Sequence, residues 1–78
     1  MPTTYDIVDA DRKRVENAFT HHPPKEDQAE RYELIREKAK ELAVLFLRST
    51  PPSRERSLAL THLEEAVFNA NAAIARNE

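Results

Sequence analysis

Two proline pairs, Pro23-Pro24 and Pro51-Pro52, divide the chain into segments that one continuous helix cannot join. Proline lacks a backbone N–H and pushes the preceding residue away from the α-helical region, so each pair ends a helix or turns the chain. The sequence has no glycine, which argues against tight primed hairpin turns and glycine-rich phosphate loops. The prolines therefore favour an all-α chain with helices on either side of two short connections.

Apolar residues between the prolines have helical spacing and predict three helices within a single domain, residues 1–78. Residues 1–8 are expected to form an N-terminal arm, and residues 9–20 a short helix with an acidic start. Residues 25–48 and 53–76 are expected to form two long helices, and their short connection makes them antiparallel neighbours. The expected fold is all-α, with a short N-terminal helix followed by a long antiparallel helical hairpin that homo-oligomerisation completes.

Both long segments carry an apolar stripe with alternating spacings of three and four residues, which is the pattern of a heptad seam. In the first segment the stripe is Gln28, Tyr32, Ile35, Ala39, Leu42 and Phe46. In the second segment it is Leu60, Leu63, Val67, Ala70 and Ile74. We expect the two helices to pack through these stripes, with the hydroxyl of Ser53 capping the start of the second long helix.

Apolar residues surround the first long helix on all sides between Leu42 and Leu47. A helix that is apolar on every side is buried on every side, and one partner helix in a short chain covers only part of it. The chain has no cysteine for a disulfide, and its only imidazoles, those of His21, His22 and His62, offer no structural metal spacing. Self-association is therefore the expected way to complete the core.

The charge balance and the missing motifs exclude several classes of function. The 12 Lys and Arg residues are nearly matched by 14 Asp and Glu, so the chain lacks the basic excess of a protein that binds DNA or RNA. No Ser/His/Asp set, carboxylate pair or cofactor fingerprint is recognisable, so neither an enzyme nor a cofactor is expected. No apolar run is long enough to span a bilayer and no signal core is evident, which predicts a cytoplasmic protein without a membrane partner.

The junction between the first two expected helices concentrates side chains that suit a planar or anionic ligand. His21 and His22 precede the proline pair, and Lys25 follows it. A flat side chain here can stack on a base or another planar group, and Lys25 supplies a positive charge nearby. The structural alternative is that His22 caps or packs against the next helix and that His21 is exposed. Two adjacent histidines in an extended segment point to opposite sides, so no metal site is expected.

Arg36 and Arg76 are two further candidates for ligand binding. Arg36 directly follows Ile35 at the edge of the stripe, where its planar guanidinium could take a phosphate between protomers. Arg76 lies in the last turn of the final helix, where complementing the helix C-terminus is an alternative role. Asn69 and Asn71 place amides near the seam, where they either fix its register or line a pocket.

Residues 17–25, 28–43, 57–61, 63–67 and 69–77, taken together in their order and spacing, resemble the phage anti-CBASS cyclic-oligonucleotide sponge family. Its helical hairpin domain is shared with anti-Thoeris sponges. The resemblance implies a helical homohexamer that binds and sequesters cyclic dinucleotides and cyclic trinucleotides without cleaving them. The resemblance therefore implies a phage protein that acts in the cytoplasm of the infected bacterial host cell. By removing these signals it would prevent the activation of the CBASS immune effectors.

The resemblance also implies a set of ligand-binding residues, namely His21, His22, Lys25, Arg36 and Arg76. His21 stands where the family has an aromatic residue, usually Tyr, that stacks on a base, and Arg36 matches the family's phosphate contact. A related possibility is a sponge for cyclic ADP-ribose signals. A structural or adaptor module that oligomerises through its helical seam, with no small-molecule ligand, is the alternative function.

Overall fold

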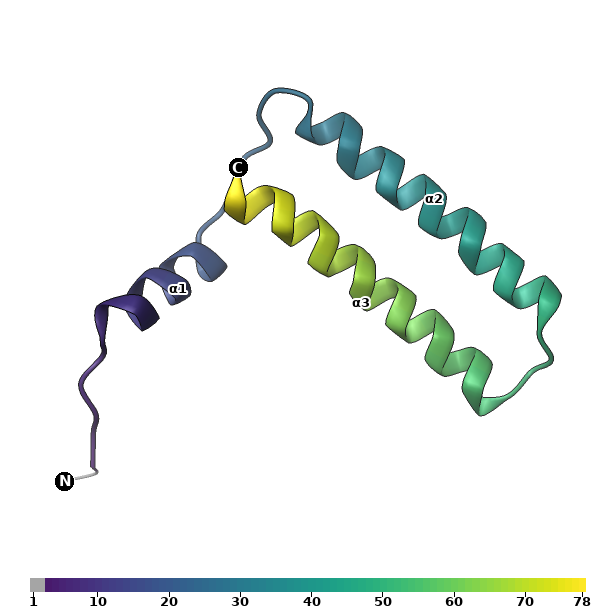
Figure 1. Ribbon diagram of the computed structural model, residues 1–78, viewed down its shortest axis with the longest axis horizontal. Helices are drawn as coiled ribbons and strands as arrows, with labels where there is room; N and C mark the ends of the chain where they lie inside the picture. The colour runs from purple at the N-terminus through teal and green to yellow at the C-terminus, as the bar shows by residue number, and fades with distance from the viewer. Residues whose placement is uncertain (1–2) are drawn as a thin grey trace.

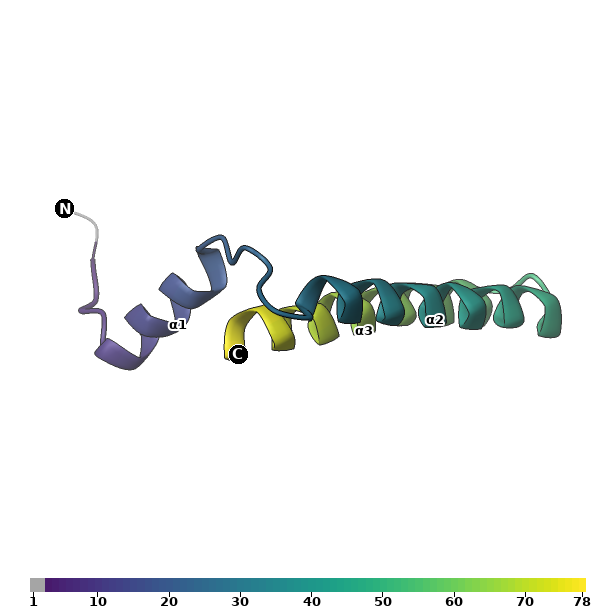
Figure 2. The ribbon, with the colours of Figure 1, turned by 90° about the horizontal axis from the view of Figure 1, so that it is seen from above.

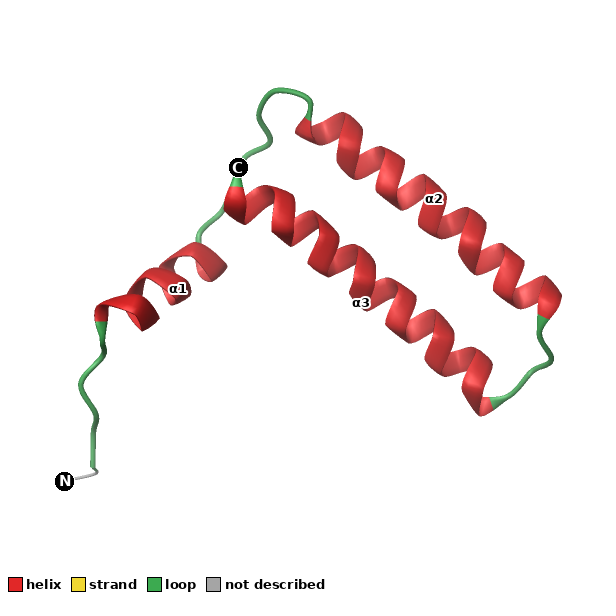
Figure 3. Ribbon diagram, viewed as in Figure 1, coloured by secondary structure: helices red, strands yellow, loops and turns green. Residues whose placement is uncertain are grey.

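The computed structural model describes residues 3–78, so residues 1 and 2 of the expected arm lie outside the described part of the chain. It contains α1 (Asp9–Phe19), α2 (Gln28–Ser49) and α3 (Arg54–Asn77). Helices α2 and α3 run antiparallel side by side, and α1 projects from the end of the hairpin where α3 finishes (Figure 1). All three elements are helices, and residues 3–78 contain no strand (Figure 3). The predicted all-α hairpin with a short N-terminal helix is confirmed.

The turn between α2 and α3 satisfies backbone groups at both helix ends. Thr50 is extended, and its N–H donates to the backbone oxygen of Phe46 at 3.1 Å, which ends α2. The Ser53 hydroxyl accepts a hydrogen bond from the Arg56 N–H at 3.1 Å and caps α3 as predicted. The Arg56 guanidinium then donates to the backbone oxygens of Leu47 at 3.3 Å and Thr50 at 3.2 Å. These carbonyls have no partner within α2 itself.

Helix α2 begins at Gln28, three residues after the expected start at residue 25. The cause is a turn, since Glu26 has a φ of 52°, in the left-handed region that an α-helix excludes. The backbone oxygen of Lys25 accepts a hydrogen bond from the Gln28 N–H at 3.0 Å and closes this turn. The turn redirects the chain from the extended prolines into α2.

The seam between α2 and α3 follows the predicted stripes with one shift. Its half-buried residues are Tyr32, Ile35, Ala39, Ala43 and Phe46 on α2 and Leu60, Leu63, Val67, Ala70 and Ile74 on α3. The expectation for Leu42 is wrong, because Leu42 is 39% exposed and Ala43 takes its place. A straight α-helix drifts by about 20° per heptad against a strict seven-residue repeat. Over the two heptads from Gln28 the drift is about 40°, which carries Leu42 toward one edge of the seam while Ala43 borders the seam from the other edge. Phe46, one turn later, is again on the predicted stripe.

The hairpin forms a single layer of helices. The chain measures 54 × 39 × 15 Å, and α2 and α3 lie in one plane when seen from above (Figure 2). Its radius of gyration is 17.8 Å, whereas a compact domain of this length is expected to have about 11.5 Å. A domain normally buries its apolar faces between two packed layers. One chain supplies only one of these layers, and both broad faces of the hairpin stay open.

This openness leaves apolar side chains uncovered. No apolar residue among residues 3–78 is fully buried. Val44, Leu45 and Leu47, which were expected to be covered on every side, are 42%, 56% and 47% exposed. The accessible surface is 6872 Å², about 2,000 Å² more than a folded monomer of this mass should have. None of the helices in the described chain combines the length and apolarity needed to cross a bilayer.

Candidate functional site

A surface pocket of 370 Å³ lies where the end of α1, the loop 20–27 and the ends of α2 and α3 meet. We call it the junction pocket, and its walls are Ala18, Thr20, His21, His22, Tyr32, Arg36, Asn71, Ala72, Ala75 and Arg76. It brings together all the predicted ligand-binding residues except Lys25. The walls carry two guanidinium groups and no carboxylate. The local charge therefore favours an anionic group, although the whole chain has a net charge of -2.

The two histidines have different environments. His22 is half buried, and its Nε2 lies 2.8 Å from the backbone oxygen of Asn17 in α1. A carbonyl oxygen only accepts, so Nε2 must carry the proton that it donates. His21 is exposed at the pocket wall. His22 thus has a structural role, which was the alternative to ligand binding. It differs from that expectation in one respect, because His22 binds the loop to α1 and not to the helix that follows, α2.

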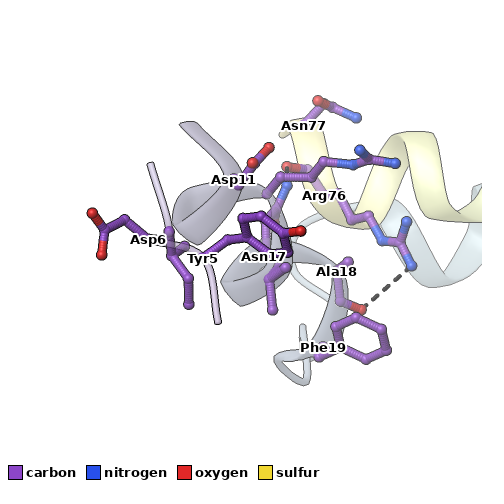
Figure 4. Close-up of a pocket in the computed structure, with 11 residues that line it drawn as sticks. Tyr5, Asp6, Asp11, Asn17, Ala18, Phe19, Arg76 and Asn77 are labelled. Carbon is purple, nitrogen blue, oxygen red and sulfur yellow. Dashed lines mark hydrogen bonds between the residues drawn. The ribbon is translucent and has the colours of Figure 1, made fainter. Parts of the chain in front are cut away.

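Arg76 joins the last turns of α1 and α3. Its Nη2 donates to the backbone oxygen of Ala18 at 3.4 Å, a contact drawn as the dashed line in Figure 4. In return, Asn17 Nδ2 donates to the backbone oxygen of Arg76 at 3.2 Å. Because α1 otherwise diverges from the hairpin, these two hydrogen bonds and that of His22 hold this side of the pocket together.

Arg36 contributes the second guanidinium from α2. Its Nη1 lies 2.8 Å from Oε2 of Glu33, and the two side chains are 61% and 59% exposed. An ion pair this exposed contributes only about 0–1 kcal/mol, so Arg36 can exchange Glu33 for a phosphate at little cost. Arg36 also borders an apolar groove of 410 Å³ along the hairpin, whose other walls are Ala39, Lys40, Ala43, Leu60, Leu63, Glu64, Val67 and Phe68.

Three polar residues of the pocket are not among the ligand-binding residues predicted from the sequence: Thr20, Tyr32 and Asn71. Tyr32 was assigned only to the seam, although it lies one turn before Arg36 on the same helical face, which is a signal that could have identified it. Asn71 was expected to fix register or line a pocket, and it does line the pocket. Its Oδ1 is buried without a hydrogen-bond partner among residues 3–78, a condition that costs about 1–3 kcal/mol.

Lys25 does not line the junction pocket but takes part in a separate cluster, which we call the hairpin clasp: Lys25, Gln28, Arg31 and Glu78. Lys25 Nζ donates to the backbone oxygen of Glu78 at 2.9 Å. The Glu78 carboxylate accepts hydrogen bonds from Arg31 Nη1 at 2.7 Å and from Gln28 Nε2 at 3.2 Å. These hydrogen bonds, with Arg31 the stronger influence, lower the pKa of Glu78 to about 2, and the same contact raises the pKa of Arg31.

A larger hollow of 1010 Å³ lies between the N-terminal arm, α1 and the end of α3 (Figure 4). Arg76 is a wall of both this hollow and the junction pocket. The larger hollow combines Arg14 and Arg76 with Asp6 and Asp11, so its charges cancel and it has no preference for anions. No group of three potential metal ligands occurs in the chain from residue 3 onward.

A family model described as the Acb2/Tad1 hairpin domain matches residues 11–75. The match extends from the first turn of α1 almost to the end of α3 and includes every wall of the junction pocket except Arg76. The N-terminal arm and Glu78 lie outside it. No curated protein and no solved structure matches the chain.

Proposed function

The chain belongs to the Acb2/Tad1 hairpin family of anti-CBASS and anti-Thoeris sponges, and from this premise we propose that it captures cyclic dinucleotides and cyclic trinucleotides without cleaving them. Members of this family are sponge-type binding proteins for cyclic nucleotide signals and are not known as enzymes. The observation that carries the proposal is the junction pocket, which gathers two imidazoles and two guanidinium groups without a carboxylate. By binding the signal in the cytoplasm of the infected bacterial cell, the protein would block CBASS immunity.

Each side chain has a proposed task in the pocket. The exposed ring of His21 stacks on a base, and the fork of Arg36 binds a phosphate in place of Glu33. Arg76 supports the phosphate from α3, and His22 holds the loop that carries His21 to α1. Lys25, outside the pocket, is proposed to contact a further phosphate.

The size of the junction pocket supports a site shared between copies of the chain. Its 370 Å³ is near the low end of the roughly 300–1,000 Å³ of small-molecule sites, which suits one nucleotide unit of a larger ring. Cyclic dinucleotides have near two-fold symmetry, and cyclic trinucleotides have near three-fold symmetry. A closed oligomer can therefore present the same residues to each unit of the ligand.

The assembly that we propose is a homohexamer. The surface excess of about 2,000 Å² per chain is larger than the roughly 800 Å² that each partner buries in a standard interface. Another copy of the chain can cover two apolar surfaces: the groove beside Phe68 and the exposed side chains of the helical turn from Val44 to Leu47 in α2. Six copies of the 9.0-kDa chain give about 54 kDa, which light scattering can distinguish from a dimer or trimer.

Calorimetry with a panel of cyclic dinucleotides, cyclic trinucleotides and cyclic ADP-ribose compounds tests the proposal. Arg36→Gln should weaken binding roughly 10- to 150-fold, because a charge-assisted hydrogen bond contributes about 1.5–3 kcal/mol. Lys38→Gln is the matched control, since it removes the same charge from the same helix at an exposed position outside the pocket. Equal losses in the two variants would contradict a direct phosphate contact by Arg36.

A structural or adaptor module with no small-molecule ligand is the second candidate, and the exposed apolar groove favours it. Such a module would assemble or bind a partner helix through the groove. It predicts that the whole panel fails to bind while the oligomer persists, and that alanine at His21 and Arg36 changes nothing.

A further inference from the structure

The hairpin clasp combines three features that are unusual in this chain. Gln28 is the one buried residue among residues 3–78, with 3% exposure. Glu26, in the turn just before it, is the one residue in that range with a positive φ. The ion pair of Arg31 and Glu78 joins residues 47 positions apart, whereas the other ion pairs in this range join residues three or four apart. The fold therefore builds a carboxylate-binding arrangement at the open end of the hairpin.

Two of the donors, Gln28 and Arg31, are also held by hydrogen bonds that do not involve Glu78. Gln28 Oε1 accepts a hydrogen bond from the Lys25 backbone N–H at 3.1 Å, which fixes the direction in which Gln28 Nε2 donates. Arg31 Nε donates to Asp27 Oδ1 at 3.1 Å, which leaves both terminal nitrogens of Arg31 directed at Glu78. A two-pronged guanidinium of this kind fits carboxylates and phosphates equally in geometry. With the Lys25 ammonium alongside and the Asp27 carboxylate on Arg31 Nε, the cluster without Glu78 carries one net positive charge, which a phosphate monoanion or diester can neutralise as the Glu78 side chain does.

The occupant of this site is accessible to solvent. The Arg31 and Glu78 side chains are 36% and 39% exposed, so a competing anion can reach the guanidinium while Glu78 is still bound. Water and salt weaken an ion pair at such exposure. Glu78 also follows the last residue of α3, so it can leave without unwinding that helix.

We propose that Lys25, Gln28 and Arg31 form a phosphate-binding site in which the carboxylate of Glu78 is a displaceable occupant. The site is distinct from the junction pocket, since none of these three residues lines that pocket. Its ligand is a phosphate monoester or diester, and no bond is made or broken on binding. The inference does not depend on the junction pocket taking a cyclic nucleotide.

Titration with inorganic phosphate, followed by NMR at the side chains of Arg31 and Gln28, tests the site. Glu78→Gln keeps a side chain of the same size but removes the competing charge, so phosphate should bind this variant at least tenfold more tightly than the wild type. Glu65→Gln is the control for net charge, because the Glu65 side chain is 59% exposed and its one ion pair within residues 3–78 is with His62. A second substitution, Arg31→Gln, should abolish the gain. Equal phosphate affinity in the Glu78 and Glu65 variants would overturn the proposal.

A measurement on the unchanged chain gives an independent test that no folding defect can affect. As phosphate binds, the carboxyl carbon of Glu78 should shift toward the value of a free glutamate. The pKa of Glu78 should rise from about 2 toward its ordinary value of 4.5. If the Glu78 signal and its pKa stay constant throughout the phosphate titration, Glu78 is a permanent structural contact and the proposal is wrong.

Discussion

Replacing Phe68 with alanine should weaken assembly without unfolding the hairpin. Phe68 is 72% exposed and borders the apolar groove together with Leu60 and Leu63. A phenylalanine side chain presents about 200 Å², so roughly 140 Å² is free to be covered by another copy. At about 25 cal/mol per Å², covering it contributes roughly 3.5 kcal/mol per chain. Alanine recovers only part of that contact, so we expect a loss of about 2–3 kcal/mol, or roughly 30- to 150-fold in the dissociation constant.

Sedimentation equilibrium over a dilution series measures this change directly. The Phe68→Ala variant should dissociate at a higher concentration than the wild type, by the factor given above. Its free energy of unfolding as a single chain should change by less than about 0.5 kcal/mol, because the residue is exposed there. His62→Ala is the control, since its ring is 70% exposed on the same helix and does not border the groove. Identical dissociation of all three proteins would refute the groove as an interface.

Three further predictions concern single contacts. Ser53→Ala removes the cap of α3 and should lower the free energy of unfolding in a denaturant titration by about 1 kcal/mol, whereas Ser57→Ala, at an exposed position within the helix, should change it little. The folded-state pKa of Glu78 is lowered to about 2, so its contribution to stability is fully present above its ordinary pKa of 4.5 and is lost as the pH falls toward 2. Thermal melts between pH 2 and 6 should show this loss, and Glu78→Gln should remove it. Asn71→Leu removes a buried unpaired acceptor and should raise the free energy of unfolding by about 1 kcal/mol, whereas a fall would mean that the amide is paired in the folded protein.

Local sequence signals were enough to predict the helical elements. The proline pairs prevent α1 and α2 from continuing into the connections that follow them, because proline lacks a backbone N–H and restricts the residue before it, and the hydroxyl of Ser53 acts within one turn. The start of α2 was harder to predict. Glutamate rarely adopts a positive φ, so the residue type of Glu26 gave no indication of the turn that delays the helix. The choice between Leu42 and Ala43 in the seam depends on the drift of a straight helix, which a strict heptad reading ignores.

The candidate site was predictable only where its residues share a helical face or the junction loop. Arg36 was identified from its place beside the seam, and Tyr32 could have been identified from its spacing of four residues from Arg36. The hairpin clasp could not be predicted, because Lys25 and Glu78 lie 53 positions apart and meet only when the hairpin closes. Because Lys25 is close to His21 and His22 in the chain, the sequence grouped it with them, whereas its ammonium contacts Glu78 and it does not line the junction pocket.

Recovery of the captured ligand tests the proposed sponge function most directly. The protein is incubated with one cyclic dinucleotide or cyclic trinucleotide at micromolar concentration, freed of unbound ligand, and then denatured by heat. Mass spectrometry of the released material should find the cyclic nucleotide intact, in an amount equal to that bound. Failure to retain any member of the panel, or release of a linear hydrolysis product, would contradict the account.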